Sequence, residues 1–169
     1  GTRFGKMTGE VLDPGFHVVN PINSWDHFNT LERTELFADI LVPAMDQQTA
    51  VMDVSVQFRI LPNFAAELRQ ETGTETQSLT VHFLPIVRGA LRDAGRATSK
   101  VEMFYDDEKI KAYRSEALRI IQTQLAPKGF EVTDVIIRDV QLPEIITTAI
   151  ASKKQREQEV EKERAELNR

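Results

Sequence analysis

Histidines are the residues of this sequence that could most readily hold a metal or move a proton, but their spacing does not support either role. His17, His27 and His82 form no H-x-H or H-x-x-x-H pair, the patterns that place two imidazoles next to one zinc ion. A zinc site built from His17, His27 and a carboxylate therefore has no support, and histidines at the surface or at helix caps are the better interpretation. We expect no metal and no cofactor.

Carboxylates could also carry acid–base chemistry if two of them converged. Asp39, Asp46 and Asp53 recur at intervals of seven residues, in a region with the residue types of strands. In a regular strand, an odd spacing sends successive side chains to opposite faces of the sheet. We therefore expect these aspartates to lie apart, as solvated strand and turn residues.

The sequence contains no recognisable motif for a catalytic nucleophile either. The sequence contains no cysteine, which excludes thiolate chemistry and disulfides. No serine lies in a G-x-S-x-G elbow, and neither a G-x-G-x-x-G loop nor a P-loop is present. We expect no catalytic residue and no enzyme; a hydrolase that uses His17 or His27 is the weakest alternative.

The composition is that of a folded domain with one core. The chain has 169 residues, of which 41% are hydrophobic and 28% charged. Its net charge of −5 argues against nucleic acid as a partner. No apolar run approaches the roughly 20 residues that a membrane-spanning helix needs. Because the sequence begins at Gly1 without a methionine, we expect an anchor outside it.

The elements that must position any site are predicted by periodicity. Residues 52–60 alternate between apolar and polar, which is typical of a half-buried strand, and residues 36–42 alternate less regularly. Residues 130–142 are rich in β-branched types, with two phase slips that indicate bulges. Together they predict an antiparallel, curved sheet with one open face.

Helical spacing predicts the other elements. A short helix should end before Gly73, and the run of residues 79–94 should kink or restart at Pro85. A longer helix should follow Asp106 and end before Pro127, with apolar residues from Ile110 onward on one stripe. The fold class is therefore α+β, with helices packed on the sheet.

The segment after Pro143 should form one long charged helix. It contains no glycine and no further proline, and its apolar residues are sparse. Such a helix is marginal alone in water, so it either projects as a solvated rod or packs with neighbours. We favour self-association, as in a coiled coil, through a stripe made of Ile146, Ile150, Lys153, Glu157, Val160, Arg164 and Leu167.

Apolar and aromatic residues gather near the N-terminus, where an anchor would attach. Tryptophan suits membrane interfaces because its ring is apolar while its N–H can stay hydrated. Burial in the core is the simpler interpretation of this group, and membrane contact is the alternative. The candidates for a membrane-proximal position are Phe16, Val18, Val19, Ile22, Trp25 and Phe28.

Four segments, in this order, resemble the SPFH family (stomatin, prohibitin, flotillin; also called Band 7). Residues 3–22 (RFGKMTGEVLDPGFHVVNPI) are similar to the opening strand and P-G-[LF]-H turn of the family. Residues 44–60 resemble its D-x-Q segment with a long alternating strand, and residues 83–93 its prohibitin-like helix. Residues 128–159 resemble its closing strand and charged helix.

The resemblance covers nearly the whole chain, with prohibitin and the bacterial HflK/HflC-like proteins most similar. It implies an SPFH domain over residues 1–142 and the start of a coiled-coil-type helix over residues 143–169. The sequence departs from the family in having no membrane-inserting N-terminal segment. It also has only Arg164-Ala165-Glu166 where alanine–glutamate repeats are usual.

The function implied by the resemblance is that of a non-enzymatic scaffold on a membrane. Such proteins form homo- or hetero-oligomers with SPFH relatives, contact membrane lipid, organise membrane domains and enclose or regulate membrane proteases. A non-polymerising adaptor that binds a single membrane protease or channel is the alternative. The side of the membrane stays open.

Overall fold

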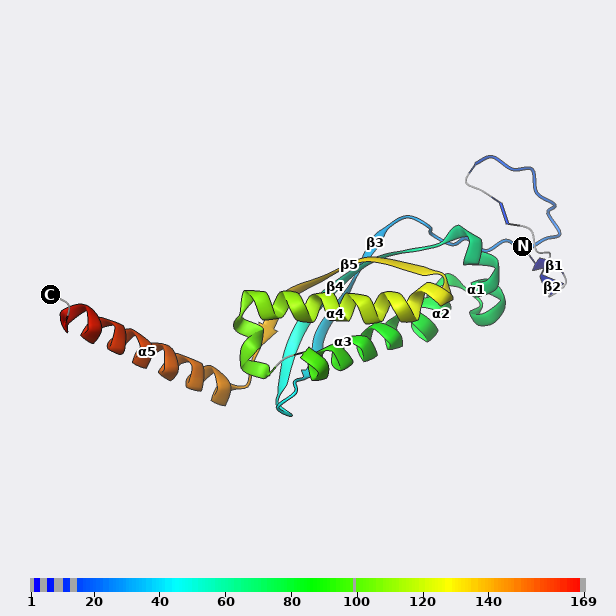
Figure 1. Cartoon of the computed structure of the whole chain (residues 1–169). Coiled ribbons are helices and arrows are strands. Elements are labelled where there is room, and N and C mark those ends of the chain that lie inside the picture. The colour runs from blue at the N-terminus through cyan, green and yellow to red at the C-terminus, as the bar shows by residue number, and fades with distance from the viewer. Residues whose placement is uncertain (1, 4–5, 8–10, 13–14, 99, 168–169) are drawn as a thin grey trace.

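The computed structural model describes residues 2–3, 6–7, 11–12, 15–98 and 100–167. Figure 1 shows an elongated body, with the N-terminal segment at one end and a helix projecting from the other. The strands are β1 (Thr2–Arg3), β2 (Lys6–Met7), β3 (Arg33–Pro43), β4 (Thr49–Ile60) and β5 (Phe130–Gln141). The α-helices are α1 (Ala65–Thr72), α2 (Glu75–Ser78), α3 (Leu84–Thr98), α4 (Asp107–Leu125) and α5 (Glu144–Leu167).

The body is built on an antiparallel sheet with the strand order β3-β4-β5. The alternation predicted for residues 52–60 is confirmed in β4, where every second side chain from Met52 to Ile60 is fully buried. The α+β class is confirmed as well. β1 and β2 form a separate two-stranded sheet.

All three long strands depart from regular pairing. The register of β5 against β4 shifts between Asp53 and Val54 and between Gln57 and Phe58, which confirms the predicted bulges. β3 also bulges, between Phe37 and Ile40, where Asp39 has a φ of 51°. A bulge inserts an extra residue and increases the local twist, so it bends the sheet around the helices.

The helices α3 and α4 cover one face of this sheet (Figure 1). A fresh helix start at Pro85 was one of the two predicted alternatives, but the structure keeps a continuous helical backbone there. A π-helical turn over Leu79–Phe83 leads directly into α3, and the N–H of Leu84 donates to the Leu79 carbonyl. Pro85, which has no N–H to donate, follows this widened turn. Gly95 of α3 touches β3 so closely that an added Cβ would overlap Val42 and the Pro43 carbonyl.

Aromatic rings join the two layers of the core. Phe83 packs against Phe58 of β4 at a centroid distance of 3.9 Å, and it also lies 5.6 Å from Phe130 and 6.2 Å from Phe37. Tyr113 of α4 is fully buried and donates a hydrogen bond of 3.0 Å to the Leu91 carbonyl of α3. Burial raises the pKa of the Tyr113 phenol, so this side chain stays neutral and keeps its donor.

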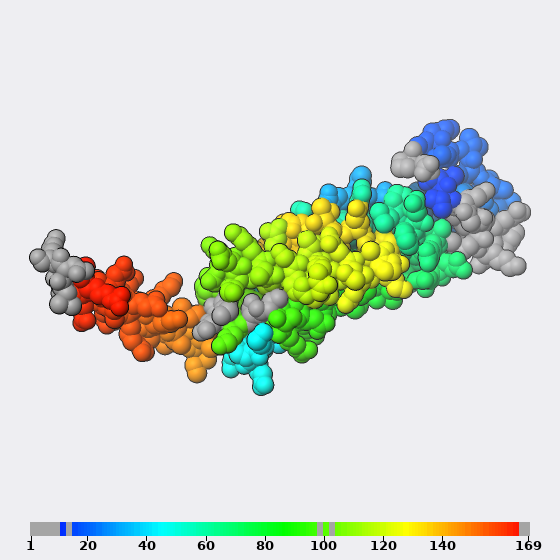
Figure 2. All heavy atoms as spheres, viewed as in Figure 1, coloured from blue at the N-terminus to red at the C-terminus, as the bar shows by residue number. Residues whose placement is uncertain are grey.

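Three short helical turns complete the body, at Pro62–Phe64, Val101–Tyr105 and Ala126–Lys128. The predicted stop at Gly73 is confirmed, because this residue has a φ of 99° directly after α1. Asp106 begins α4 as expected, since its carboxylate accepts hydrogen bonds from the N–H groups of Glu108 and Lys109. Figure 2 shows the resulting outline, a long body with α5 standing away from it.

Candidate functional site

The residues singled out for metal or acid–base chemistry lie on separate elements. His17 and His27 are exposed in the N-terminal segment, whereas His82 lies in the π-helical turn with Nε2 3.5 Å from Oε2 of Glu71. In the part of the chain that the structure describes, no group of three or more histidine, aspartate or glutamate residues could hold a metal ion.

Two of the three spaced aspartates are neighbours across the sheet. The backbone N–H of Asp39 in β3 donates a hydrogen bond of 2.9 Å to the carboxylate of Asp53 in β4. Alternation along a single strand does not control this contact, because it joins two paired strands beside the bulge in β3. Asp46 lies elsewhere, in the β3–β4 turn, where its carboxylate accepts from the Val101 N–H.

Residues 15–31 form an extended segment, here called the N-terminal arm, with much of its apolar surface in contact with solvent. Phe16 is 95% exposed and Val18 is 92% exposed, while Ile22 is 58% and Val19 40% exposed. These four side chains are therefore not part of the core. Phe28 is different, since it is half-buried and packs against the core cluster, and Trp25 is also half-buried.

One ion pair and one backbone hydrogen bond attach the base of the arm to the body, and a second ion pair lies directly beside them. Asp26 pairs with Arg69 of α1 at 2.5 Å. Glu75 of α2 accepts from the Arg33 guanidinium and from the Asn29 N–H, both at 2.5 Å. The Arg33 guanidinium also lies over the ring of Phe58, 5.1 Å from its centroid. We call Asp26, Arg69, Arg33 and Glu75 the clasp, because they join the arm to the helices.

Replacing Glu75 by alanine should loosen the arm without unfolding the body. The substitution removes the acceptor of both Arg33 and Asn29, and a lost charge-assisted hydrogen bond costs about 1–3 kcal/mol. We expect faster hydrogen exchange and faster protease cleavage within residues 15–33, with unchanged exchange in β4. Glu67→Ala on the exposed side of α1 is the matched control. Equal cleavage of the two variants would show that the clasp does not hold the arm.

The residues predicted to associate along the last helix differ in their surroundings. Ile146 packs against the core cluster and Ile150 is half-buried, so the first turns of this stripe already contact the body. Lys153, Glu157 and Arg164 are exposed, and Val160 is 48% exposed. The side chain of Leu167 lies outside the described residues.

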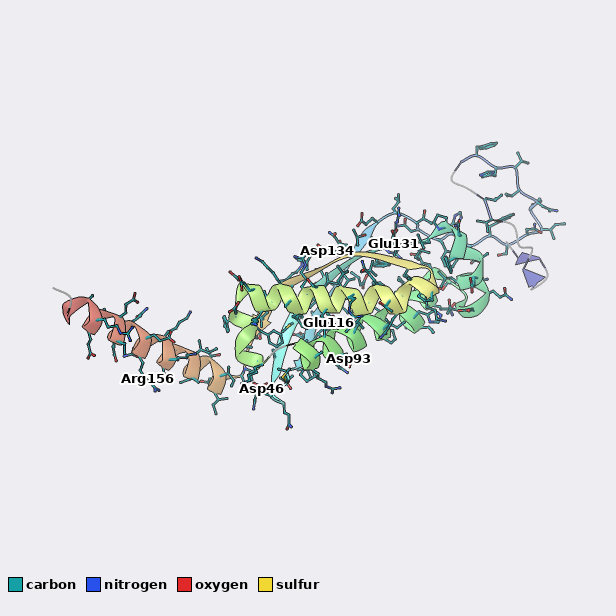
Figure 3. All side chains as sticks on the ribbon, viewed as in Figure 1. Asp46, Asp93, Glu116, Glu131, Asp134 and Arg156 are labelled. Atoms are coloured by element: carbon teal, nitrogen blue, oxygen red, sulfur yellow. The ribbon has the colours of Figure 1, made fainter. Side chains whose placement is uncertain are left out.

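A shallow depression follows another side of α5. It is lined by polar, small and apolar side chains from successive turns of this helix, namely Glu144, Ile145, Thr148, Ala149, Ser152 and Arg156. Ile145 is 73% exposed, in contrast to its neighbour Ile146. Figure 3 shows Arg156 partway along α5, with the helix projecting away from the body. Two surfaces thus face solvent at the two ends of the molecule, an apolar arm and a hydrophilic rod.

A comparison with models of protein families identifies the class to which this architecture belongs. The model of the SPFH domain / Band 7 family matches residues 2–169, so the chain belongs to this family. Members of the family are generally membrane-associated scaffolds that oligomerise, and not enzymes. The search of curated proteins finds no match for this chain.

Among the helices of the described part, none is long and apolar enough to cross a bilayer. The exposed apolar side chains of the arm belong to the group that was predicted near a membrane. Sequence reasoning named these side chains but missed the clasp, because its partners are 42 and 43 residues apart and no local pattern links them.

Proposed function

We propose that this protein is an oligomeric membrane scaffold of the prohibitin or stomatin type, which organises membrane domains and encloses or regulates a membrane protease. The observation that carries the proposal is the placement of the two solvent-facing surfaces. The arm with Phe16 and Val18 leaves the body at one end, and α5 leaves it at the other (Figure 1). Membership of the SPFH family supports the membrane and oligomer parts.

The proposed mechanism is multivalency. Each copy contributes one weak membrane contact through the arm and one weak helix contact through residues 143–169. Joining many copies raises the overall avidity by orders of magnitude without any new contact, provided that the geometry lets all arms reach the membrane together. The clasp would serve this geometry by fixing the direction in which the arm leaves the rest of the body.

The protease part of the proposal comes from the resemblance to prohibitin and the HflK/HflC-like proteins. A ring of copies with their rods side by side would surround a patch of membrane and limit access to a protease within it. The body would set the angle between neighbours and therefore the number of copies in a closed ring.

The membrane half of the proposal is tested by two substitutions in the arm. Phe16→Ser combined with Val18→Ser removes the two most exposed apolar side chains. We expect binding to phospholipid vesicles, measured by flotation, to fall by about tenfold or more, since each side chain contributes on the order of 1 kcal/mol or more when it enters the interface.

The control is Met45→Ser combined with Val81→Ser, which also removes two exposed apolar side chains but from the body, where they are 58% and 57% exposed. This control should bind vesicles like the unaltered chain. If the arm variant floats as well as the control does, the arm is not the membrane contact.

A further inference from the structure

The exposed side of α3 carries a row of arginines that the described part of the chain leaves without ion pairs. Arg88, Arg92 and Arg96 are spaced four residues apart and are all exposed, whereas Val87 and Leu91 on the other side are fully buried. None of the three arginines forms an ion pair within the described residues. Asp93 is the acidic residue of α3, labelled in Figure 3.

The sheet has an open face on the side away from α3 and α4. Core-facing side chains of β4 alternate with Val51, Asp53, Ser55, Gln57 and Arg59, which therefore point to this other side. Leu36 lies opposite Ser55, and Leu41 lies opposite Val51, so both leucines belong to the open face. They are 57% and 54% exposed, so this face carries exposed apolar surface beside its polar and charged residues.

Aspartates gather on the same open face. Asp53 lies directly opposite Asp139 of β5, and the β3 bulge brings the backbone of Asp39 to the Asp53 carboxylate. None of these aspartates forms an ion pair within the described residues, and the nearby Arg138 guanidinium donates to the Ser55 hydroxyl. Glu131 and Asp134 of β5, labelled in Figure 3, are instead paired with Arg59 and Arg114.

We propose that α3 of one copy packs on the open sheet face of a second copy. The arginine row would face the aspartates, and the helix would cover Leu36 and Leu41. The two surfaces lie on opposite sides of one body, so the contact is heterologous: each copy offers a different surface to each of its two neighbours. Such contacts close into rings when the rotation between neighbours is a fraction of a full turn.

A second copy fits these surfaces better than a membrane or a nucleic acid does. The arginine row runs along α3 for about 12 Å, along the side of the body and not across the end that bears the arm. A flat bilayer that meets the arm would therefore not lie along the row. Nucleic acid at the arginine row would be repelled by the net charge of −5. A second copy accounts for both surfaces at once, because its carboxylates would face the arginine row of the first copy and its own α3 would cover leucines on the open face of the next.

Cross-linking between single-cysteine variants tests this contact directly, because the chain has no cysteine of its own. An Arg92→Cys variant is mixed with a Leu36→Cys variant in the presence of vesicles and a short bis-maleimide. We expect a covalent dimer of the two variants. Arg92→Cys mixed with Lys111→Cys, whose cysteine replaces an exposed residue of α4, should give little dimer. Equal yields in the two mixtures would overturn the proposal.

Charge reversal gives a second, independent test. Arg92→Glu with Arg96→Glu should weaken self-association by about tenfold or more, because like charges would then face each other. Lys109→Glu with Lys111→Glu changes the net charge by the same amount on α4 and should have little effect. Mixing the Arg92→Glu, Arg96→Glu variant with Asp139→Lys should restore association between the two variants. No restoration, with both variants folded, would contradict the proposed pairing.

This inference rests on the proposed function, but the two can fail separately. If the chain assembles on vesicles and charge reversal of the arginine row does not weaken this assembly, the proposed scaffold function is supported and the α3–sheet contact is wrong. If assembly needs the arginine row but survives removal of α5, the contact stands and the role of the rod is wrong. If no assembly forms, both are wrong.

Discussion

Removing residues 146–169 should convert an assembling protein into a folded monomer. The rod contributes one packed residue, Ile146, to the core cluster, and the exposed charged side chains beyond it contribute nothing to the body. We therefore expect sedimentation analysis on vesicle-bound and detergent-released protein to give monomers. The shift is large because avidity depends on the number of linked contacts, so loss of one of two contacts reduces it by orders of magnitude.

The truncation needs a control for folding and for the loss of Ile146. A chain shortened only after Ser152 keeps both half-buried residues, Ile146 and Ile150, and loses the exposed part of the rod. Both shortened chains should keep the thermal unfolding transition of the body within a few degrees. If either one assembles like the unshortened chain, the rod is not an assembly element.

The second large effect is expected in the core, at Phe83. This ring is fully buried and contacts Phe58, Phe130 and Phe37, which come from all three strands of the main sheet. Phe83→Ala should lower the free energy of unfolding by about 3–5 kcal/mol, the usual range for removing a buried phenylalanine. Chemical denaturation followed by far-UV circular dichroism measures this loss.

Phe16→Ala is the matched control for the core substitution, because the same residue type is 95% exposed there. Its effect on unfolding should stay within about 0.5 kcal/mol, as for other surface positions without packing. An equal loss at the two positions would show that the arm packs on the body, and would remove the basis for assigning it to the membrane.

The parts of the fold that local periodicity controls were predictable from the sequence. β4 has a polar and an apolar side, and its alternation places Met52, Val54 and Val56 in the core without any knowledge of the neighbours. The two bulges of β5 were visible as phase slips, because a residue inserted into a strand shifts the apolar positions by one. An irregularity near Pro85 follows from the chemistry of proline in the same way, and it takes the form of a π-helical turn.

Features that depend on residues far apart in the sequence were not predictable. The bulge in β3 was not visible in the sequence, because Phe37 and Leu41 obscure the apolar–polar alternation of this strand. The contact between Asp39 and Asp53 beside the bulge was therefore missed. The clasp joins residues that only the folded chain brings together. The exposure of Phe16 and Val18 was also undetermined, because an apolar residue type indicates burial without indicating against what.

The stripe predicted for helix association illustrates a further limit. Heptad spacing selected Ile146, whereas the structure packs Ile146 on the body and leaves Ile145 73% exposed. Sequence spacing defines a stripe on a helix but does not say which side the rest of the domain covers. The side of the rod that stays exposed near its base carries Ile145 and Ala149, and the predicted stripe is exposed only from Lys153 onward.

The number of copies in each membrane-bound assembly is the measurement that tests the scaffold proposal most directly. Mass photometry of the protein extracted with native membrane, or reconstituted on vesicles and released in nanodiscs, gives this number for single particles. The proposal predicts a narrow distribution at many copies, as closed rings would give. Particles that hold one copy, alone or bound one-to-one to another membrane protein, would contradict it and would favour an adaptor.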